Sequence, residues 1–406
     1  MLAVLLGSAG CTLLERGSEP PSERVAVPLD DEVRDLLTRR AGAVRAGDLS
    51  AFLADVAPGG AAFRRRQQRY FLNLRELPLA TFGYLLTGDG AALDRQGRVR
   101  AEARLRMRLD GYDAHPVVTP VLFTFVRGRD GALRLVSDRN RAFTRAHDVE
   151  AAPWDLTRIE VEEGDGVLGI FDGSSVDAAY QLVPSVERAI AAVSAEVPLR
   201  WSESVVLYAL SDVRVLADLD NLPGGDPDQL DGVTFPVAGG REGRRLAGTR
   251  FMLHPRMLRG DADRASRDRL IRHELTHVAL GRRDDRVPTW LSEGIAEYVS
   301  VQPIPHHDRR ISQDALRAAR SGLSGLPKGA TFNGPQSGAN YGISWFACEH
   351  IVDVYGEEAL WRLFDAMRQG GGTAEDEQDR VLREELGISG AELARAAGRR
   401  IVNTFG

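Results

Sequence analysis

Two histidines four residues apart, with a glutamate beside the first, form the chemically most distinctive stretch of this 406-residue sequence. The segment is HELTH, and it contains His273, Glu274 and His277. On a helix, residues four apart project from one face, so both imidazoles can reach the same metal ion. Glu274 lies beside that face, where it can act as a general base on a water at the metal. The spacing predicts a zinc site, although a helix with two ordinary histidines also fits this short pattern.

A second acidic pair follows in the segment TWLSEGIAEY, as Glu293 and Glu297. Fifteen residues lie between His277 and Glu293, and they include the turn-forming stretch GRRDDRVP. We expect Glu293 to be the third metal ligand. Glu297, one turn later, is expected to accept a hydrogen bond from the far nitrogen of a ligand histidine. The alternative for this pair is a solvated helix face.

Periodic apolar residues predict the helices that must hold these side chains. The set Leu270, Ile271, Leu275, Val278 and Ala279 recurs at helical spacing and predicts a helix over 262–282. Further helices are expected over 287–301, 311–320, 341–355, 357–367, 374–386 and 390–403. Upstream, strands are expected over 157–163, 167–173, 204–211, 232–237 and 248–255, with a long helix over 175–196. A mixed sheet should therefore lead into the HELTH helix.

The first third of the chain has a different order of elements. Helical spacing covers 31–56 and 61–74, and alternating strands follow over 99–112, 117–126 and 132–138. Helices before a curled antiparallel sheet resemble the cystatin-like cone shared with nuclear transport factor two. We therefore expect an α+β chain with a cone-like domain over 30–147 and a second domain over 154–406.

The chemistry-bearing segments also resemble a known family. His-Glu-Leu-Thr-His followed by Trp-Leu-Ser-Glu-Gly-x-Ala-Glu-Tyr is similar to the gluzincin metallopeptidases, the clan of thermolysin, and among them to the bacterial peptidase MA-like families. The similarity covers about 248–403. It implies a thermolysin-like second domain that binds Zn²⁺. The implied roles are metal ligands for His273, His277 and Glu293, general base for Glu274, and histidine partner for Glu297.

Two further segments are interpreted through the same resemblance. ANYGISWFACEHIVDVYG is similar to a helix of the aminopeptidases whose tyrosine stabilises the oxyanion, and Tyr341 is the corresponding residue. A buried tyrosine at a helix start is the alternative. The strand 248–255 is expected to be the edge strand that pairs with substrate. It lacks the Gly-x-Met-Glu-Asn signature of aminopeptidases, which favours an endopeptidase. Ordinary structural roles are expected for His254, His306, His307, Asp308, Cys348, Glu349 and His350.

The N-terminus predicts the cellular location. MLAVLLGSAGC resembles the signal peptide and lipobox of bacterial lipoproteins, which implies a signal peptide over 1–11, a lipid anchor on Cys11 and a linker over 12–29. The apolar run is too short for a transmembrane helix. The protein is therefore expected on the extracytoplasmic face of the cell membrane.

Composition narrows the classes of partner. The formal net charge is −6, and acidic and basic residues are interspersed, so no nucleic-acid partner is expected. The function that the sequence favours is a zinc-dependent metallopeptidase that hydrolyses peptides or proteins outside the cytoplasm. The alternative is a non-catalytic, zinc-containing surface lipoprotein that binds a peptide or envelope partner.

Overall fold

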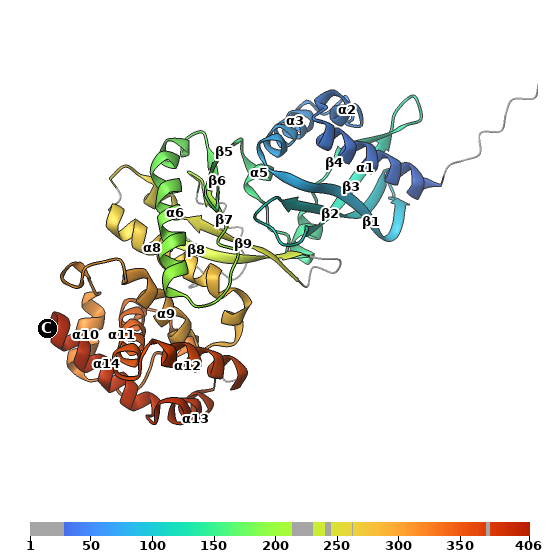
Figure 1. Ribbon diagram of the computed structural model, residues 1–406. Coiled ribbons are helices and arrows are strands. Elements are labelled where there is room, and N and C mark those ends of the chain that lie inside the picture. The colour runs from blue at the N-terminus through green and yellow to red at the C-terminus, as the bar shows by residue number, and fades with distance from the viewer. Residues whose placement is uncertain (1–27, 213–229, 240–244, 262, 371–373) are drawn as a thin grey trace, which may run out of the picture.

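The computed structural model describes residues 28–212, 230–239, 245–261, 263–370 and 374–406. Cys11, the expected signal peptide and nearly all of the expected linker lie outside these residues. The described chain is a mixture of helices and strands (Figure 1).

Three helices open the described chain, where the sequence predicted two helical stretches. They are α1 (Leu29–Ala46), α2 (Leu49–Ala54) and α3 (Ala61–Glu76). The break after α1 has a local cause, because Gly47 ends that helix with φ 71° and Asp48 begins the next one. The Asp48 carboxylate accepts a hydrogen bond from the Ala51 N–H at 2.9 Å, which caps α2.

Four antiparallel strands follow: β1 (Leu79–Leu93), β2 (Val99–Leu109), β3 (Val117–Arg127) and β4 (Leu133–Ser137). The last three match the expected strands to within a few residues. The first was not predicted, because Gly83, Gly88 and Gly90 interrupt its apolar alternation and glycine weakens a strand signal.

The second part of the chain adds five strands to the same sheet. Its first elements are α4 (Arg141–Ala146), α5 (Pro153–Leu156), β5 (Ile159–Gly164), β6 (Val167–Asp172), α6 (Ala179–Glu196), β7 (Val205–Ala209), β8 (Gly232–Gly239) and β9 (Arg245–Leu253). In the part of the chain that the structure describes, nine strands form one curled mixed sheet of order β1-β2-β3-β8-β9-β7-β6-β5, with β4 beside β3. The two halves of the sheet join where Val117 of β3 pairs with Gly239 of β8.

Both faces of the second half of the sheet are buried. Val167 and Phe171 of β6 pack with α6 and the helices beyond it. Leu168 and Ile170 of the same strand pack on the opposite side, in a core that includes Phe71 of α3. Alternate residues of one strand thus contribute to two cores, and the N-terminal helices supply part of the second core.

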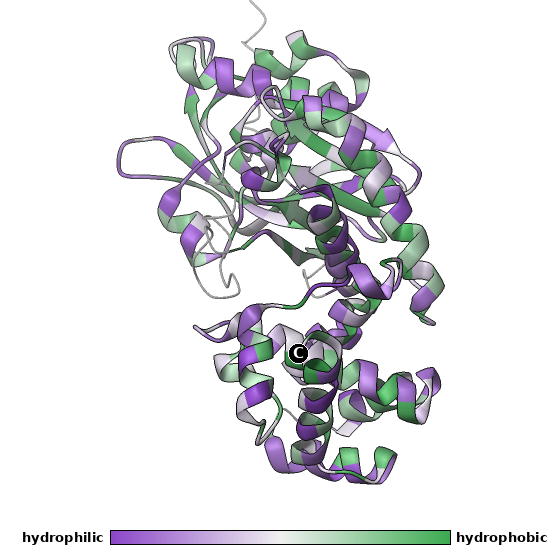
Figure 2. Ribbon diagram, turned by 90° about the vertical axis from the view of Figure 1, so that its left-hand side faces the viewer, coloured by the Kyte–Doolittle hydropathy of each residue, from purple (hydrophilic) through white to green (hydrophobic). Residues whose placement is uncertain are grey.

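The remainder of the chain is helical. It consists of α8 (Arg264–Leu280), α9 (Thr289–Val301), α10 (Gln313–Ser321), α11 (Ser337–Tyr355), α12 (Glu357–Gly370), α13 (Glu375–Leu386) and α14 (Gly390–Phe405). In Figure 1, α8 lies beside α6 against the sheet, whereas α10 to α14 form a separate helical layer below it. Green and purple residues alternate along these helices in Figure 2, as expected for helices with one buried face.

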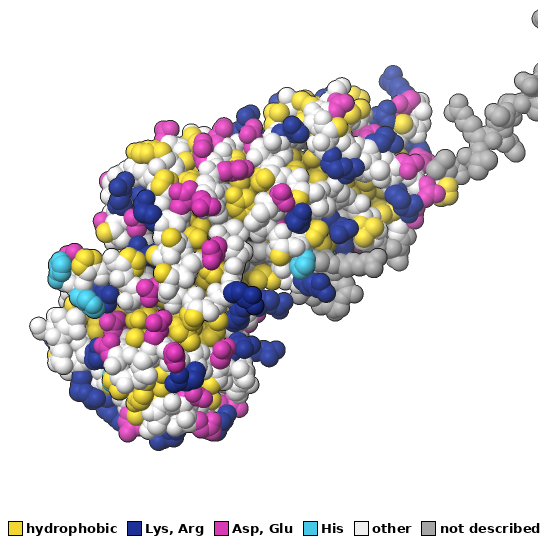
Figure 3. All heavy atoms as spheres, viewed as in Figure 1, with side chains coloured by type: hydrophobic (Ala, Val, Ile, Leu, Met, Phe, Trp, Pro, Cys, Tyr) yellow, Lys and Arg dark blue, Asp and Glu magenta, His cyan; other side chains and the backbone are white. Residues whose placement is uncertain are grey.

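The surface contains charges of both signs. Figure 3 shows acidic and basic side chains interspersed over the face in view. Among the described residues, no helix combines the length and the apolar character that a membrane span requires.

Candidate metal centre

The helix α8 holds the HELTH residues in a buried position. It begins after Asp263, whose carboxylate accepts hydrogen bonds from the N–H groups of Ala265 and Ser266 at 3.3 and 3.1 Å. Farther along, Ile271 and Leu275 are fully buried in the core against the sheet and α6. The helix lies next to α9, so the residues that follow HELTH return to its side.

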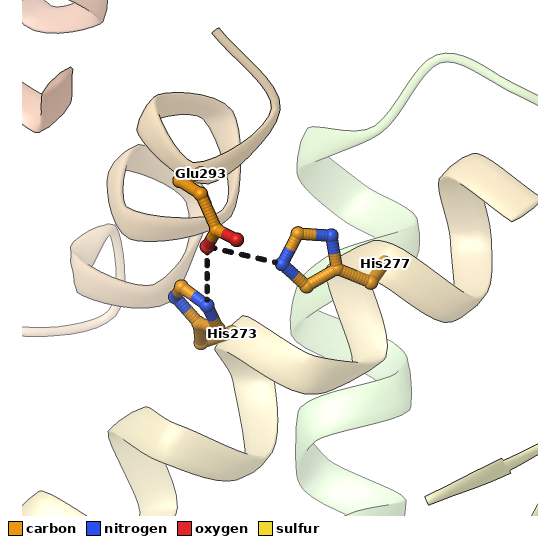
Figure 4. Close-up of side chains that lie close together, drawn as sticks. All are labelled: His273, His277 and Glu293. Atoms are coloured by element: carbon orange, nitrogen blue, oxygen red, sulfur yellow. Dashed lines mark ion pairs between the residues drawn. The ribbon is translucent and has the colours of Figure 1, made fainter. Parts of the chain in front are cut away.

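Three donor side chains converge between these two helices (Figure 4). His273 Nε2 lies 3.2 Å from Glu293 Oε2, and His277 Nε2 lies 3.4 Å from the same oxygen. The donor atoms of His273, His277 and Glu293 all lie within 4.8 Å of one another. Two imidazole nitrogens and a carboxylate oxygen are the donor set that a catalytic Zn²⁺ prefers. The structure thus brings together the three ligands that the sequence predicted.

Each of the two imidazoles also has a carboxylate near its Nδ1, the nitrogen that does not face Glu293. His273 Nδ1 lies 3.0 Å from Glu297 Oε1, the expected partner, although the ring is not aligned for a straight hydrogen bond. His277 Nδ1 is hydrogen-bonded to Asp284 Oδ2 at 2.9 Å. A carboxylate on Nδ1 fixes the proton there and leaves Nε2 free to bind a metal. The sequence analysis missed Asp284; the only signal for it was an acidic pair in the connecting turn.

Glu297 is itself held by a cation. Arg269, one turn before His273, forms an ion pair with the Glu297 carboxylate. The guanidinium lies over the ring of Trp345, 5.0 Å from its centroid, and donates a hydrogen bond to the Arg310 carbonyl at 3.1 Å. The contacts of Arg269 with Trp345 and Glu297 therefore hold the Glu297 carboxylate beside Nδ1 of His273.

The electrostatics of the cluster favour an added positive charge. Burial by itself lowers the pKa of His273, but Glu293 and Glu297 outweigh it and raise that pKa to about 9. His277 shows the same balance, with its pKa well above the ordinary value because of Glu293 and Asp284. Burial raises the pKa of Glu293, but the two histidines reverse this and hold it far below the ordinary value. Without a metal, protons must offset the carboxylates, and a divalent cation can replace them.

A short 3-10 turn connects α8, which carries His277, to α9, which carries Glu293. The helix α8 ends at Gly281, where φ is 55°, and a 3-10 turn over Gly281–Arg286 leads to Pro288, the residue before α9. This turn also carries Asp284 to His277. The short connection therefore places Glu293 next to α8, and it also contains Asp284, the hydrogen-bond partner of His277.

Close packing of α9 against α11 brings Tyr341 to the metal ligands. A Cβ atom on Gly294 would lie 2.6 Å from the Ser344 carbonyl oxygen, so the helices can approach this closely only because residue 294 is a glycine. The Tyr341 ring centroid lies 5.9 Å from that of His273, and the hydroxyl donates a hydrogen bond to Asn333 Oδ1 at 3.3 Å. Asn333 was not singled out from the sequence.

Tyr341 lies inside α11, not at its start, because the helix begins four residues earlier than expected. Burial, followed by the charges of Glu293 and Glu274, raises the pKa of its hydroxyl far above the ordinary value. The hydroxyl therefore keeps its proton and remains a hydrogen-bond donor.

An open cleft borders the cluster of His273, His277 and Glu293. One compartment of about 710 Å³ and another of about 360 Å³ both contact His273, Glu274 and Tyr341, so the two compartments meet at these three residues. The strand β8 lines both of them, and its Thr234 hydroxyl donates a hydrogen bond to the Glu274 carbonyl at 3.2 Å. The prediction that residues 248–255 form the edge strand was wrong: β9 lies between β7 and β8, and β8 is the strand at the cleft.

The remaining candidates lie in structural positions. His254 is buried, and its Nδ1 accepts a hydrogen bond from the Arg256 N–H at 3.1 Å at the start of a 3-10 turn, outside the strand. His306, His307 and Asp308 form an exposed turn. Cys348 is fully buried, as expected for core packing.

Glu349 and His350 lie on α11. Glu349 accepts a hydrogen bond from the Trp345 indole N–H at 3.0 Å and pairs with Arg309 at 3.3 Å, which makes it part of a structural network. The ring of His350 packs edge-on against Tyr355.

No protein-family model matches this chain, and no curated protein is significantly similar to it in sequence.

Proposed function

We propose that this protein is a zinc-dependent metallopeptidase of the gluzincin type. One observation carries the proposal: the metal-binding atoms of His273, His277 and Glu293 converge at the floor of an open cleft that Glu274 also lines. A site that served only structure would be closed on all sides by protein ligands. The carboxylates on the outer nitrogens of both histidines add support, because they orient the ring nitrogens for a metal.

The chain supplies the groups that peptide hydrolysis requires. Zn²⁺ at this site would polarise the scissile carbonyl and lower the pKa of the attacking water. Glu274 takes a proton from that water and passes it to the nitrogen of the departing amine. The Tyr341 hydroxyl donates a hydrogen bond to the oxyanion that develops on the carbonyl oxygen. Glu297 and Asp284 hold the two histidines during these steps.

The shape of the cleft favours cleavage within a chain over removal of a terminal residue. Two compartments meet at His273, Glu274 and Tyr341, so substrate residues have space both before and after a bond held at these residues. Within the described residues, β8 pairs with β9 along its length but with β3 only at Gly239. An extended peptide can add to the open edge of such a strand.

The proposal also includes the fold of the two parts of the chain and the cellular location of the protein. Residues 154–406 would form a thermolysin-like unit and residues 30–147 a cone-like unit beside it. Cys11 would carry the lipid that anchors the protein outside the cytoplasm. Mass spectrometry of the protein from its native membrane should find a diacylglyceryl modification on Cys11, and an unmodified, unprocessed N-terminus there would reject the anchor.

Chelation tests the activity. The purified protein should cleave an unfolded protein substrate, lose this activity when a chelator removes its metal, and recover it with one equivalent of Zn²⁺ per chain. Absence of cleavage on a broad peptide mixture, despite a full zinc complement, would contradict a peptidase. That result would favour a surface lipoprotein that binds peptides without turnover.

A further inference from the structure

We propose that the larger compartment of the cleft binds apolar side chains of the substrate on the N-terminal side of the scissile bond. The substrates would be extended polypeptide segments with a large apolar residue shortly before the cleaved bond. This inference rests on the proposed peptidase function and adds a specificity to it. Its structural basis is a shelf formed by the hairpin of β8 and β9.

The shelf is the face of the hairpin that looks toward α8. Alternate residues of a strand point to opposite faces. Thr234 points to α8, as its hydrogen bond to Glu274 shows, and Pro236 has the same parity. Pro236 and Ala238 pair with Thr249 and Leu246 of β9 across the hairpin, and a register shift between Val237 and Ala238 lets these two β9 residues, three apart in the sequence, line the same compartment. All four line the larger compartment. The shelf is therefore composed of Pro236, Ala238, Leu246 and Thr249, and three of the four are apolar.

The opposite face of the hairpin is fixed to the N-terminal part of the chain. Val233 contributes to the core on that side. Arg250 of β9 forms a fully buried ion pair with Asp113, at 2.8 Å between Nη2 and Oδ1. Ala114 N–H donates a hydrogen bond to the Ala247 carbonyl at 2.7 Å, and a Cβ atom on Gly248 would lie 2.7 Å from Asp113 Oδ1. These contacts hold the shelf as a rigid wall. Binding of a substrate side chain therefore does not require the shelf to become ordered first.

The direction of β8 determines which end of the substrate meets the shelf. The strand runs from Gly232, beside the ligand cluster, to Ala238, which lines only the larger compartment. A peptide that pairs antiparallel with β8, the more stable arrangement, runs in the opposite direction. Its N-terminal residues therefore lie beside Pro236 and Ala238. With about 3.4 Å per residue, the shelf spans about four residues before the scissile bond.

The smaller compartment has a different character. Its walls beyond the shared residues include Ser266, Arg269, Asn333 and Ser337, which are polar or charged. In the same antiparallel arrangement, this compartment receives the residues after the scissile bond. The apolar selection is therefore expected on one side of the bond only.

The shelf compartment also has a polar rim of both signs. Arg282 and Asp285 line it from the 3-10 turn after α8, 3.6 Å apart, and their side chains are mostly exposed. The charges of Arg282 and Asp285 offset each other, and the exposed Arg245 at the start of β9 adds one positive charge at the same compartment. We expect burial of apolar area on the shelf to be the main reason why one substrate is preferred over another. One large apolar side chain is enough for a preference of about 10-fold or more over a substrate that lacks it.

Cleavage-site profiling tests this inference. The zinc-loaded protein is incubated with a mixture of peptides of all compositions, and the cleaved bonds are identified by mass spectrometry. We expect Leu, Phe, Met or Ile to be enriched at one of the four positions before the bond, with weaker selection after it. Apolar selection confined to the positions after the bond, or no selection at all, would overturn the inference while leaving the peptidase intact. Absence of any cleavage would overturn both.

Substitutions on the shelf provide a second readout. In Ala238→Asp and Leu246→Asp, the added carboxylate should reduce kcat/KM for a peptide with an apolar residue before the bond by at least about 10-fold. The same variants should improve the relative cleavage of a peptide with Lys there. Zinc content should stay at one per chain. Leu93→Asp, on the exposed end of β1 far from the cleft, is the matched control and should keep the wild-type profile. Unchanged profiles in both shelf variants would refute the assignment of the shelf.

Discussion

At the scale of single residues, the most informative contact is the hydrogen bond between His277 and Asp284. The carboxylate lies in the turn between the two ligand-bearing helices and reaches the ring nitrogen that faces away from Glu293. It therefore favours the tautomer with the proton on Nδ1 and holds the His277 ring with Nε2 toward Glu293. The 3-10 turn Gly281–Arg286 thus connects the two helices and also contributes Asp284 to the candidate site.

Replacing this carboxylate should weaken the metal site without destroying it. In Asp284→Ala, we expect the zinc affinity to fall by about 10- to 100-fold, because the imidazole loses the group that orients it. Competition with a fluorescent zinc chelator measures this directly. Asp285→Ala is the control, since that neighbouring carboxylate is 60% exposed and pairs with Arg282. Equal affinities for the Asp284 variant and the wild type would show that Asp284 has no role in metal binding.

Tyr341 allows a kinetic prediction. Its hydroxyl keeps its proton, and its ring centroid lies 5.9 Å from that of His273. Tyr341→Phe should lower kcat by about 10- to 1000-fold with little change in KM, because the lost hydrogen bond forms mainly in the transition state. Zinc content and thermal stability should not change. A variant with wild-type kcat would assign Tyr341 to packing alone.

At the scale of secondary-structure elements, the ligand-bearing helices were predictable and their surroundings were not. Helical spacing of apolar residues identifies α8 and α9, and the spacing of the histidines identifies the helix face that carries the candidate metal site. Strand alternation, in contrast, says which residues are buried but not which strand lies beside which, so residues 248–255 were wrongly expected at the edge of the sheet. Asp284 and Asn333 lie outside regular helices and strands, where only the folded chain determines what they contact.

The hairpin of β8 and β9 depends on a buried ion pair. Both side chains of the pair Arg250 and Asp113 are at most 2% exposed. Asp113 Oδ2 also accepts a hydrogen bond from the Leu109 N–H at 2.9 Å. Asp113→Ala leaves the guanidinium buried without its counter-charge, so we expect a loss of about 3–5 kcal/mol in the free energy of unfolding.

Denaturant titration measures that loss, and a neighbouring pair provides the control. Asp110 lies 3.4 Å from Arg108 at the surface, and its side chain is 71% exposed. Asp110→Ala should therefore cost at most about 1 kcal/mol. If both variants lost the same stability, the buried pair would not be what fixes the hairpin.

At the scale of the whole molecule, the sheet unites the two units that the sequence suggested. The core between α3 and the strands β5 to β9 contains residues from both sides of position 150. The part of the sheet next to the metal centre therefore has one face covered by the N-terminal helices. The sequence could not reveal this continuity, because strand alternation does not say which strands pair across the segment between the two expected domains, 30–147 and 154–406.

Removal of the N-terminal part should consequently expose an apolar sheet face. A fragment of residues 154–406 would leave Leu168, Ile170, Val206, Tyr208 and Met252 uncovered. We expect this fragment to be insoluble or to bind hydrophobic dyes, whereas the full chain should unfold in a single transition. A soluble fragment that binds zinc with full affinity would show that the second unit folds alone.

The central claim is that a metal held by His273, His277 and Glu293 works with Glu274 to hydrolyse peptides. Glu274 lies in the cleft but outside the ligand set, so it can be changed without removing the metal. The most direct test compares the wild-type protein with Glu274→Gln, measuring zinc per chain and peptide cleavage on the same samples. We predict one zinc in both proteins and a loss of kcat of at least about 100-fold in the variant. A zinc-loaded Glu274→Gln protein that cleaves as fast as the wild type would contradict this mechanism.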